Sequence, residues 1–152
     1  MLERWYTVHS GVHRLGEALL SEVGAGLGLA ESDFRVLWFL VNTPGQAAPM
    51  NELSRVLRFS TAGTTKLVDR LTDAGLAQRR MSPTDRRVTL AALTPAGVEV
   101  TVRASGILAA AVRRHIVEPL GEEAFSALVA TIGALAPSDG SAPCAAKAPP
   151  AC

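Results

Sequence analysis

Residues 60–76 contain both the start and the stop signal of one short helix, and this segment limits the possible folds more than any other. Ser60 is a favourable N-cap, because its hydroxyl can accept a hydrogen bond from a backbone N–H of the first turn. Gly75 supplies the left-handed turn that often ends a helix, and Leu76 follows as the apolar residue that folds back. The spacing between these signals predicts one buried face, formed by Thr64, Leu67, Val68 and Leu71.

The segments on either side of this helix predict a compact DNA-binding layout. A short helix is expected from about Met50 to Leu57, which places it almost end to end with the helix after Ser60. Two partly β-branched segments, 76–80 and 88–93, flank the polar loop 81–87, as in a hairpin with a charged tip. Two short helices followed by such a hairpin predict a winged helix-turn-helix, whose second helix enters the DNA major groove.

Longer helices are predicted outside this region. Residues 1–27 carry apolar side chains at steps of three and four, and Gly24, Gly26 and Gly28 are expected to break that helix. Ser32 with Asp33 predicts the N-cap of a second helix that packs Phe34, Leu37, Trp38 and Val41, and 43–49 is expected to be a loop. Thr94 and Pro95 predict the start of a third helix, which Pro119 should end after about Val117, and a last helix is expected at about 122–136. The fold class is therefore mainly α with a small β-hairpin wing (α+β).

Charge is distributed unevenly along the chain. The net charge is only +1, yet between Arg55 and Leu90 there are eight basic and three acidic residues. This local excess favours a surface that meets phosphate, although a basic cluster is more often a solvated face. The longest apolar run, 107–112, is far shorter than the ~20 residues of a membrane span. Charged residues throughout 1–23 argue against a secretory signal, so a cytoplasmic location is expected.

Candidate DNA-contacting residues lie on the helix after Ser60 and in the wing. The outward helix face and its flanks offer hydroxyl groups, one Lys and one Arg, which suit base edges and phosphates: Ser60, Thr61, Ala62, Thr65, Lys66 and Arg70. For Arg70 an ion pair to another helix is an equal alternative. At the wing tip, Arg86 and Arg87 are expected to reach a minor groove, with Asp85 holding one guanidinium in a bidentate pair.

Two stretches resemble the MarR family of regulators. The first is the wing sequence Asp85-Arg-Arg-Val-Thr-Leu-Ala-Ala-Leu-Thr-Pro-Ala-Gly97, which is similar to the family's Asp-x-Arg followed by Leu-Thr-x-x-Gly. The second is Ser60 to Leu71 with Gly75-Leu76, which is similar to the family's recognition helix and the turn after it. The sequence departs from that pattern at Gly63 and Thr64, and the glycine alone costs about 1 kcal/mol of helix propensity.

The resemblance implies a domain plan and a function. It implies an N-terminal dimerisation helix (1–30), the DNA-binding lobe (31–94) and C-terminal dimerisation helices (95–137), while composition predicts a disordered tail (138–152). A family member of this kind would bind a pseudo-palindromic operator on double-stranded DNA as a homodimer, typically as a repressor released by a small aromatic or phenolic effector. Four residues could line an effector site: Trp5, His9, His13 and Arg14. We favour dimer packing for Trp5 and an exposed helix face for the other three.

Other functions find little support in the sequence. No nucleophile with its base, no paired carboxylates and no phosphate loop is evident, so neither an enzyme nor a cofactor is expected. His115 lacks partners at metal-ligand spacing, so no metal is expected. Cys144 and Cys152 lie in the predicted tail, where nothing would lower a thiol pKa, so a redox role is not favoured. The remaining alternative is a winged-helix protein for general DNA packing or protein contact, without operator selectivity.

Overall fold

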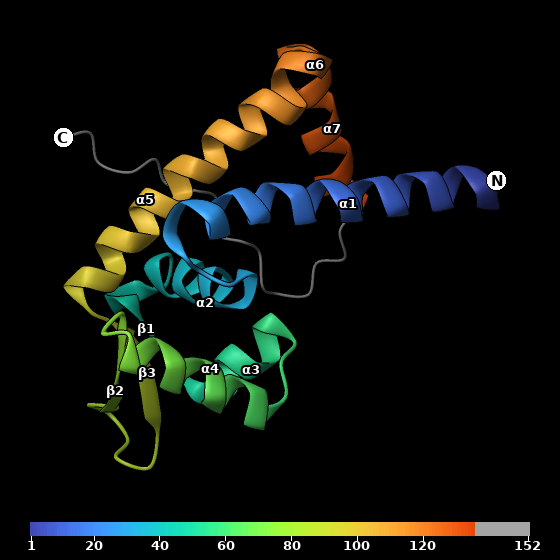
Figure 1. Ribbon diagram of the computed structural model, residues 1–152. Helices are drawn as coiled ribbons and strands as arrows, with labels where there is room; N and C mark the ends of the chain where they lie inside the picture. Colours follow the sequence, from blue (N-terminus) through green and yellow to red (C-terminus); the bar gives the residue numbers. More distant parts are fainter. Residues whose placement is uncertain (136–152) are drawn as a thin grey trace.

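The computed structural model describes residues 1–135, which form seven α-helical segments and a three-stranded sheet (Figure 1). The helices are α1 (Leu2–Leu27), α2 (Glu31–Val41), α3 (Met50–Leu57), α4 (Thr61–Asp73), α5 (Pro95–Val112), α6 (Glu118–Leu120) and α7 (Glu122–Leu135). Figure 1 shows α3, α4 and the sheet at one end, with α6 and α7 at the other. The fold class predicted from the sequence is confirmed. The expected tail at 138–152, with Cys144 and Cys152, lies outside the described residues.

The main core joins α2, α3 and α4 to the sheet. Its buried side chains include Leu37, Val68 and Leu71, which the sequence predicted, together with Leu40 and Leu53. Ser60 caps α4, since its Oγ accepts the Gly63 N–H at 3.0 Å. Gly75 adopts a φ of 72° directly after α4, as the sequence predicted. These local signals fix the length of α4 and therefore which of its faces is left outside the core.

The sheet has one strand more than the sequence predicted. Its antiparallel order is β1-β3-β2, with β1 at Ala47–Pro49, β2 at Ala77–Met81 and β3 at Thr89–Leu93. The expectation that 43–49 is only a loop is therefore wrong, because Ala47 pairs with Ala92 and Pro49 with Leu90. Three residues that end in a proline carry no strand pattern of their own. The strand exists because β3 offers it a hydrogen-bonding edge.

Two boundaries of the predicted helices differ in the structure, and one residue expected in the core is exposed. Gly24 and Gly26 lie inside α1, and only Gly28, at a φ of 68°, ends it. The N-cap of α2 is Ala30, so Asp33 occupies the third helical position and not the cap. Trp38, expected in the core, is 39% exposed. Glycines at 24 and 26 are tolerated because they let α1 pack closely, and a Cβ on Gly26 would come within 2.8 Å of Ile107 of α5.

The helix that begins at Pro95 continues past Pro119, contrary to the prediction. Residues Arg113–Val117 form a π-helical turn (η2) between α5 and α6, and Gly121, at a φ of 82°, ends the run. A π turn changes the local hydrogen-bond register, which accommodates a residue that has no N–H. By length and composition alone, Pro95–Leu120 would also be long enough to cross a membrane, a test that core helices of soluble proteins pass too. Its inward residues Thr101, Ala104 and Ala111 are buried.

Candidate DNA-binding interface

The outward face of α4 gathers most of the residues proposed to read DNA. Thr61, Ala62 and Lys66 are exposed, and Thr65 is half-buried beside them. Their shared orientation follows from the helical repeat, since Leu67, Val68 and Leu71 turn the opposite face into the core. Residues 61–66 of this face carry hydroxyl groups and one Lys, whereas Asp69, further along the helix, is exposed and pairs with Arg79. Small hydroxylated residues and one Lys are side chains that suit base edges in a major groove.

A partly buried hydrogen bond joins α3 to α4 and explains one departure from the family pattern. Thr64 is buried, and its hydroxyl oxygen lies 2.8 Å from that of Ser54, which in turn donates to the Met50 carbonyl at 3.0 Å. An aliphatic residue at position 64 would leave the Ser54 hydroxyl with one partner fewer. The polar residue is therefore part of the packing between the two helices. Sequence reasoning missed this pair because the two positions lie on different helices.

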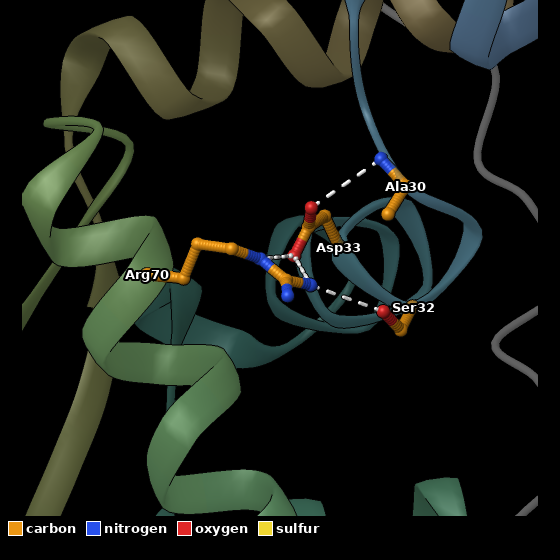
Figure 2. A network of polar contacts seen from close by, with 4 residues as sticks. All are labelled: Ala30, Ser32, Asp33 and Arg70. Carbon is orange, nitrogen blue, oxygen red and sulfur yellow. Dashed lines mark hydrogen bonds and ion pairs between the residues drawn. The ribbon is translucent and has the colours of Figure 1, made fainter.

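Arg70 faces α2 and not the outer face of α4. Its Nε donates to Asp33 Oδ1 at 3.0 Å, and its Nη2 donates to both Asp33 Oδ1 and Ser32 Oγ (Figure 2). The other Asp33 oxygen accepts the Ala30 N–H at 3.3 Å. The structure thus shows the ion pair between helices that the sequence left as one alternative, and it supplies Asp33 as the partner, which the sequence did not.

The wing tip presents two arginines to solvent. Arg86 and Arg87 are exposed, and neither forms an ion pair within the part of the chain that is described. The expected bidentate pair between Asp85 and an arginine is not formed. Instead, Asp85 Oδ1 accepts the backbone N–H of Arg87 at 2.9 Å, which makes an Asx turn at the tip. Asp85 therefore shapes the loop and leaves both guanidinium groups available.

The base of the wing is locked to the first turn of α5. Thr94 Oγ1 donates to the Gly75 carbonyl at 2.7 Å and accepts the Gly97 N–H at 3.0 Å. A Cβ on Gly97 would lie only 1.9 Å from the Leu76 carbonyl oxygen, so this position admits no side chain. The Leu-Thr-x-x-Gly sequence thus encodes a tight contact between the end of α4, β3 and α5.

The remaining basic residues divide into engaged and exposed groups. Arg79 pairs with Asp69 of α4 at 2.8 Å, and Arg80 donates to the Gly45 carbonyl at 3.4 Å. Arg55 and Arg58 are exposed near the turn between α3 and α4. Arg58 has a φ of 56°, which holds it at the left-handed end of α3. Its place beside the start of α4 makes it a candidate phosphate contact that the sequence argument did not single out.

The proposed effector residues do not form an enclosed site in a single chain. Trp5, His9, His13 and Arg14 are exposed along α1, and the rings of Trp5 and His9 lie 6.3 Å apart. His13 Nε2 lies 3.5 Å from Glu17 Oε1. A shallow, open cavity of about 390 Å³ lies further along α1, where α1 meets the start of α2, and it is lined by Glu17, Leu20, Ser21, Gly24, Ala25, Leu29 and Glu31.

His115, which the sequence left without partners, contacts α1. Its Nε2 lies 2.7 Å from Glu22 Oε1, and Arg114 donates to Glu22 Oε2 at 2.8 Å. The hydrogen bond with His115 lowers the pKa of the Glu22 carboxyl below its usual 4.5, partial desolvation opposes this, and the positive charge of Arg114 assists it. Within residues 1–135, no group of three or more His, Cys, Asp or Glu side chains is placed to hold a metal ion.

Comparison with known proteins points to the same part of the chain, the helix-turn-helix and the wing. The model of the MarR family matches residues 26–88, which span the α1–α2 junction, the helix-turn-helix and most of the wing. This part of the chain matches the MarR family. MarR family members are transcription regulators and not enzymes. A curated protein similar to this chain is the HTH-type transcriptional regulator MhqR of Bacillus subtilis. The two are 35% identical over 71 residues, which is 47% of this chain and only about half (48%) of MhqR.

Solved MarR structures extend the likeness to the flanking helices. AbsC, a MarR family transcriptional regulator from Streptomyces coelicolor, superposes with a TM-score of 0.75 at 25% identity, covering 88% of this chain and 90% of AbsC. The transcriptional repressor CouR, solved bound to a 23-mer DNA duplex, gives a TM-score of 0.74 at 27% identity, covering 86% and 89%. The MarR fold of this chain therefore includes α1 and the C-terminal helices.

Proposed function

We propose that this protein is a MarR family transcription regulator in the cytoplasm that binds a pseudo-palindromic operator as a homodimer. The observation that carries the proposal is the placement of α4 and the β2–β3 loop at the same end of the molecule (Figure 1), because that loop contains the exposed Arg86 and Arg87. Thr61, Thr65 and Lys66 would contact base edges, while Arg86 and Arg87 would enter the adjacent minor groove. CouR supports this assignment, since a relative of the same fold is bound to duplex DNA.

Dimerisation is proposed from the apolar side chains that a single chain leaves exposed. On α1 these include Trp5, 64% exposed, and Tyr6, 71% exposed. On α6 and α7 they are Leu120, Leu128, Val129, Ile132 and Leu135. Patches of this kind mark interfaces between proteins, and a second copy of the chain would cover the same helices symmetrically. Two copies would also provide two α4 helices for two half-sites.

Repression and release by a small aromatic or phenolic effector complete the proposal. A repressor is the assignment that CouR supports. The effector would bind near the open cavity at the α1–α2 junction, or against Trp5, His9, His13 and Arg14 once a second copy covers them. Ligand-dependent loss of operator binding by the purified dimer would test this part separately.

The deciding experiment compares DNA affinities at matched salt. Purified protein should bind a duplex from its own promoter region on the order of a thousandfold more tightly than unrelated duplex of equal length. Equal affinity for both duplexes at every salt concentration would instead favour the alternative of general DNA packing. A duplex carrying only one half of the palindrome should bind more weakly, because only one lobe of a dimer can then engage.

A further inference from the structure

The Asp33 carboxylate makes two different contacts, one with each of its oxygens. Oδ2 accepts the Ala30 N–H at the junction between α1 and α2, while Oδ1 accepts the Arg70 guanidinium from α4 (Figure 2). The Asp33 side chain is 10% exposed and that of Arg70 is 56% exposed. The carboxylate is thus nearly buried, and the arginine reaches it from the rim of α4.

A contact of this kind differs from an ordinary surface ion pair. Exposed pairs contribute little, because water screens the charges and two long side chains lose freedom. Here one partner is fixed by burial and by its own bond to the backbone, and the guanidinium also donates a hydrogen bond to a second acceptor, Ser32 Oγ, at 3.2 Å. A guanidinium held by two acceptors sets direction as well as distance. The C-terminal half of α4 is therefore fastened to the start of α2.

We infer that Arg70 is a positioning residue, which acts through Asp33 to set the orientation of the DNA-reading face of α4. This inference rests on the proposed function, since orientation matters only if α4 enters DNA. Arg70 and the outward Lys66 lie four residues apart, on the same helix but with different neighbours. A rotation of α4 that released Arg70 would move Lys66 and Thr65 together.

The test uses three variants of the full chain: Arg70→Gln, Asp33→Asn and the double variant. Asn at position 33 still offers an oxygen to the Ala30 N–H but carries no charge for Arg70. If Arg70 positions α4, each single change weakens operator binding by about tenfold, and the double variant loses no more than either single one. The slope of affinity against salt stays equal to that of the parent, because no phosphate contact is removed.

If Arg70 instead contacts a DNA phosphate directly, Asp33→Asn should not weaken operator binding. Removing the competing carboxylate would then leave binding unchanged or make it tighter, while Arg70→Gln would lower the salt slope by about one unit. That pair of results would overturn the inference. Asp73→Asn is the matched control, because Asp73 is exposed at the end of α4 and forms no ion pair with another described residue. It should bind within about twofold of the parent.

Hydrogen exchange in the free protein gives a readout that does not need DNA. Amides of α4 should exchange about three- to tenfold faster in both single variants, with the β2–β3 hairpin unchanged. Unchanged α4 exchange in either variant would overturn the inference even if operator affinity fell. If exchange rises as expected but the parent shows no operator preference, the link between α2 and α4 stands and the proposed function fails.

Discussion

At the scale of single residues, Gly97 offers the sharpest test of the packing. A Cβ at this position would lie 1.9 Å from the Leu76 carbonyl oxygen, which belongs to the backbone and cannot turn aside. We therefore expect Gly97→Ala to lower the free energy of unfolding by about 1–3 kcal/mol or more, as overpacking does. Urea unfolding followed by circular dichroism measures the change.

Gly106 provides the control on the same helix. A Cβ there would meet nothing within 4 Å. Gly106→Ala should therefore be neutral or stabilise the protein by up to about 1 kcal/mol, because alanine is the better helix former. Equal unfolding curves for the two variants would contradict the close contact at the base of the wing.

The hydroxyl pair between α3 and α4 gives a second prediction for single residues. Thr64→Val preserves the shape of a buried side chain but removes its hydrogen bond to Ser54. The free energy of unfolding should fall by about 1 kcal/mol, since Ser54 Oγ keeps the Met50 carbonyl as its acceptor. Ser54→Ala should be measured in the same way, alone and together with Thr64→Val. The double variant should lose less unfolding free energy than the sum of the two single losses. Strict additivity of the two changes would show that the hydroxyl groups do not interact.

At the scale of elements, the wing and α4 are expected to make different contributions to DNA binding. Arg87→Ala should weaken operator binding by about 1–3 kcal/mol and reduce the salt slope by about one unit, because one cation near phosphate is lost. Lys66→Ala should change the preference between operator variants if its amine meets a base. Salt titrations of affinity, with circular dichroism as a folding control, separate the two. If Arg87→Ala bound the operator like the parent at every salt concentration, the wing would not contribute to DNA binding.

The contact of α1 with the π turn predicts a pH-dependent contribution to stability. The pKa of Glu22 is lowered in the folded chain, mainly by the His115 hydrogen bond, so its ionised form stabilises the fold. That contribution is complete above the usual pKa of 4.5 and is lost as the pH falls through the lowered folded-state value. Glu22→Gln should therefore destabilise the protein at pH 7 and lose its effect in acid. Glu99→Gln, at an exposed position without an ion pair among residues 1–135, should show no such difference.

Local signals predicted the elements well, and contacts between distant residues account for what was missed. The Ser60 cap, the Gly75 turn and the Thr94 start each depend on three or four neighbouring residues, and all three are present in the structure. Strand β1, by contrast, exists through pairing with β3, and Asp33 finds Arg70 at a separation of 37 residues. Of the candidate site, the sequence placed the α4 face and the wing tip. The sequence could not show which arginines already form ion pairs within the chain, as Arg70 and Arg79 do.

At the scale of the whole molecule, exposed apolar side chains predict the oligomeric state. Leu128 and Ile132 lie on α7, 42% and 52% exposed, and would be covered in a homodimer. Light scattering should give the mass of a dimer at micromolar concentration, and Ile132→Glu should shift it toward monomer. Met81→Glu changes a somewhat more exposed apolar side chain, 59% exposed, at the wing and should leave the mass unchanged. A parent protein that is monomeric at this concentration would contradict the proposed dimer.

The firm contact at Gly97 has a further consequence for such a dimer. The helical run from Pro95 to Leu120 has 26 residues, so it is about 39 Å long at about 1.5 Å per residue. Since its first turn is fixed to the base of the wing, this run acts as a lever arm between the DNA-binding lobe and α7. A tilt of about 5° at the α7 end would displace the lobe by about 3 Å, against a spacing of about 34 Å between half-sites. A small rearrangement far from α4 would thus be enough to misalign the two DNA-binding lobes with the two half-sites.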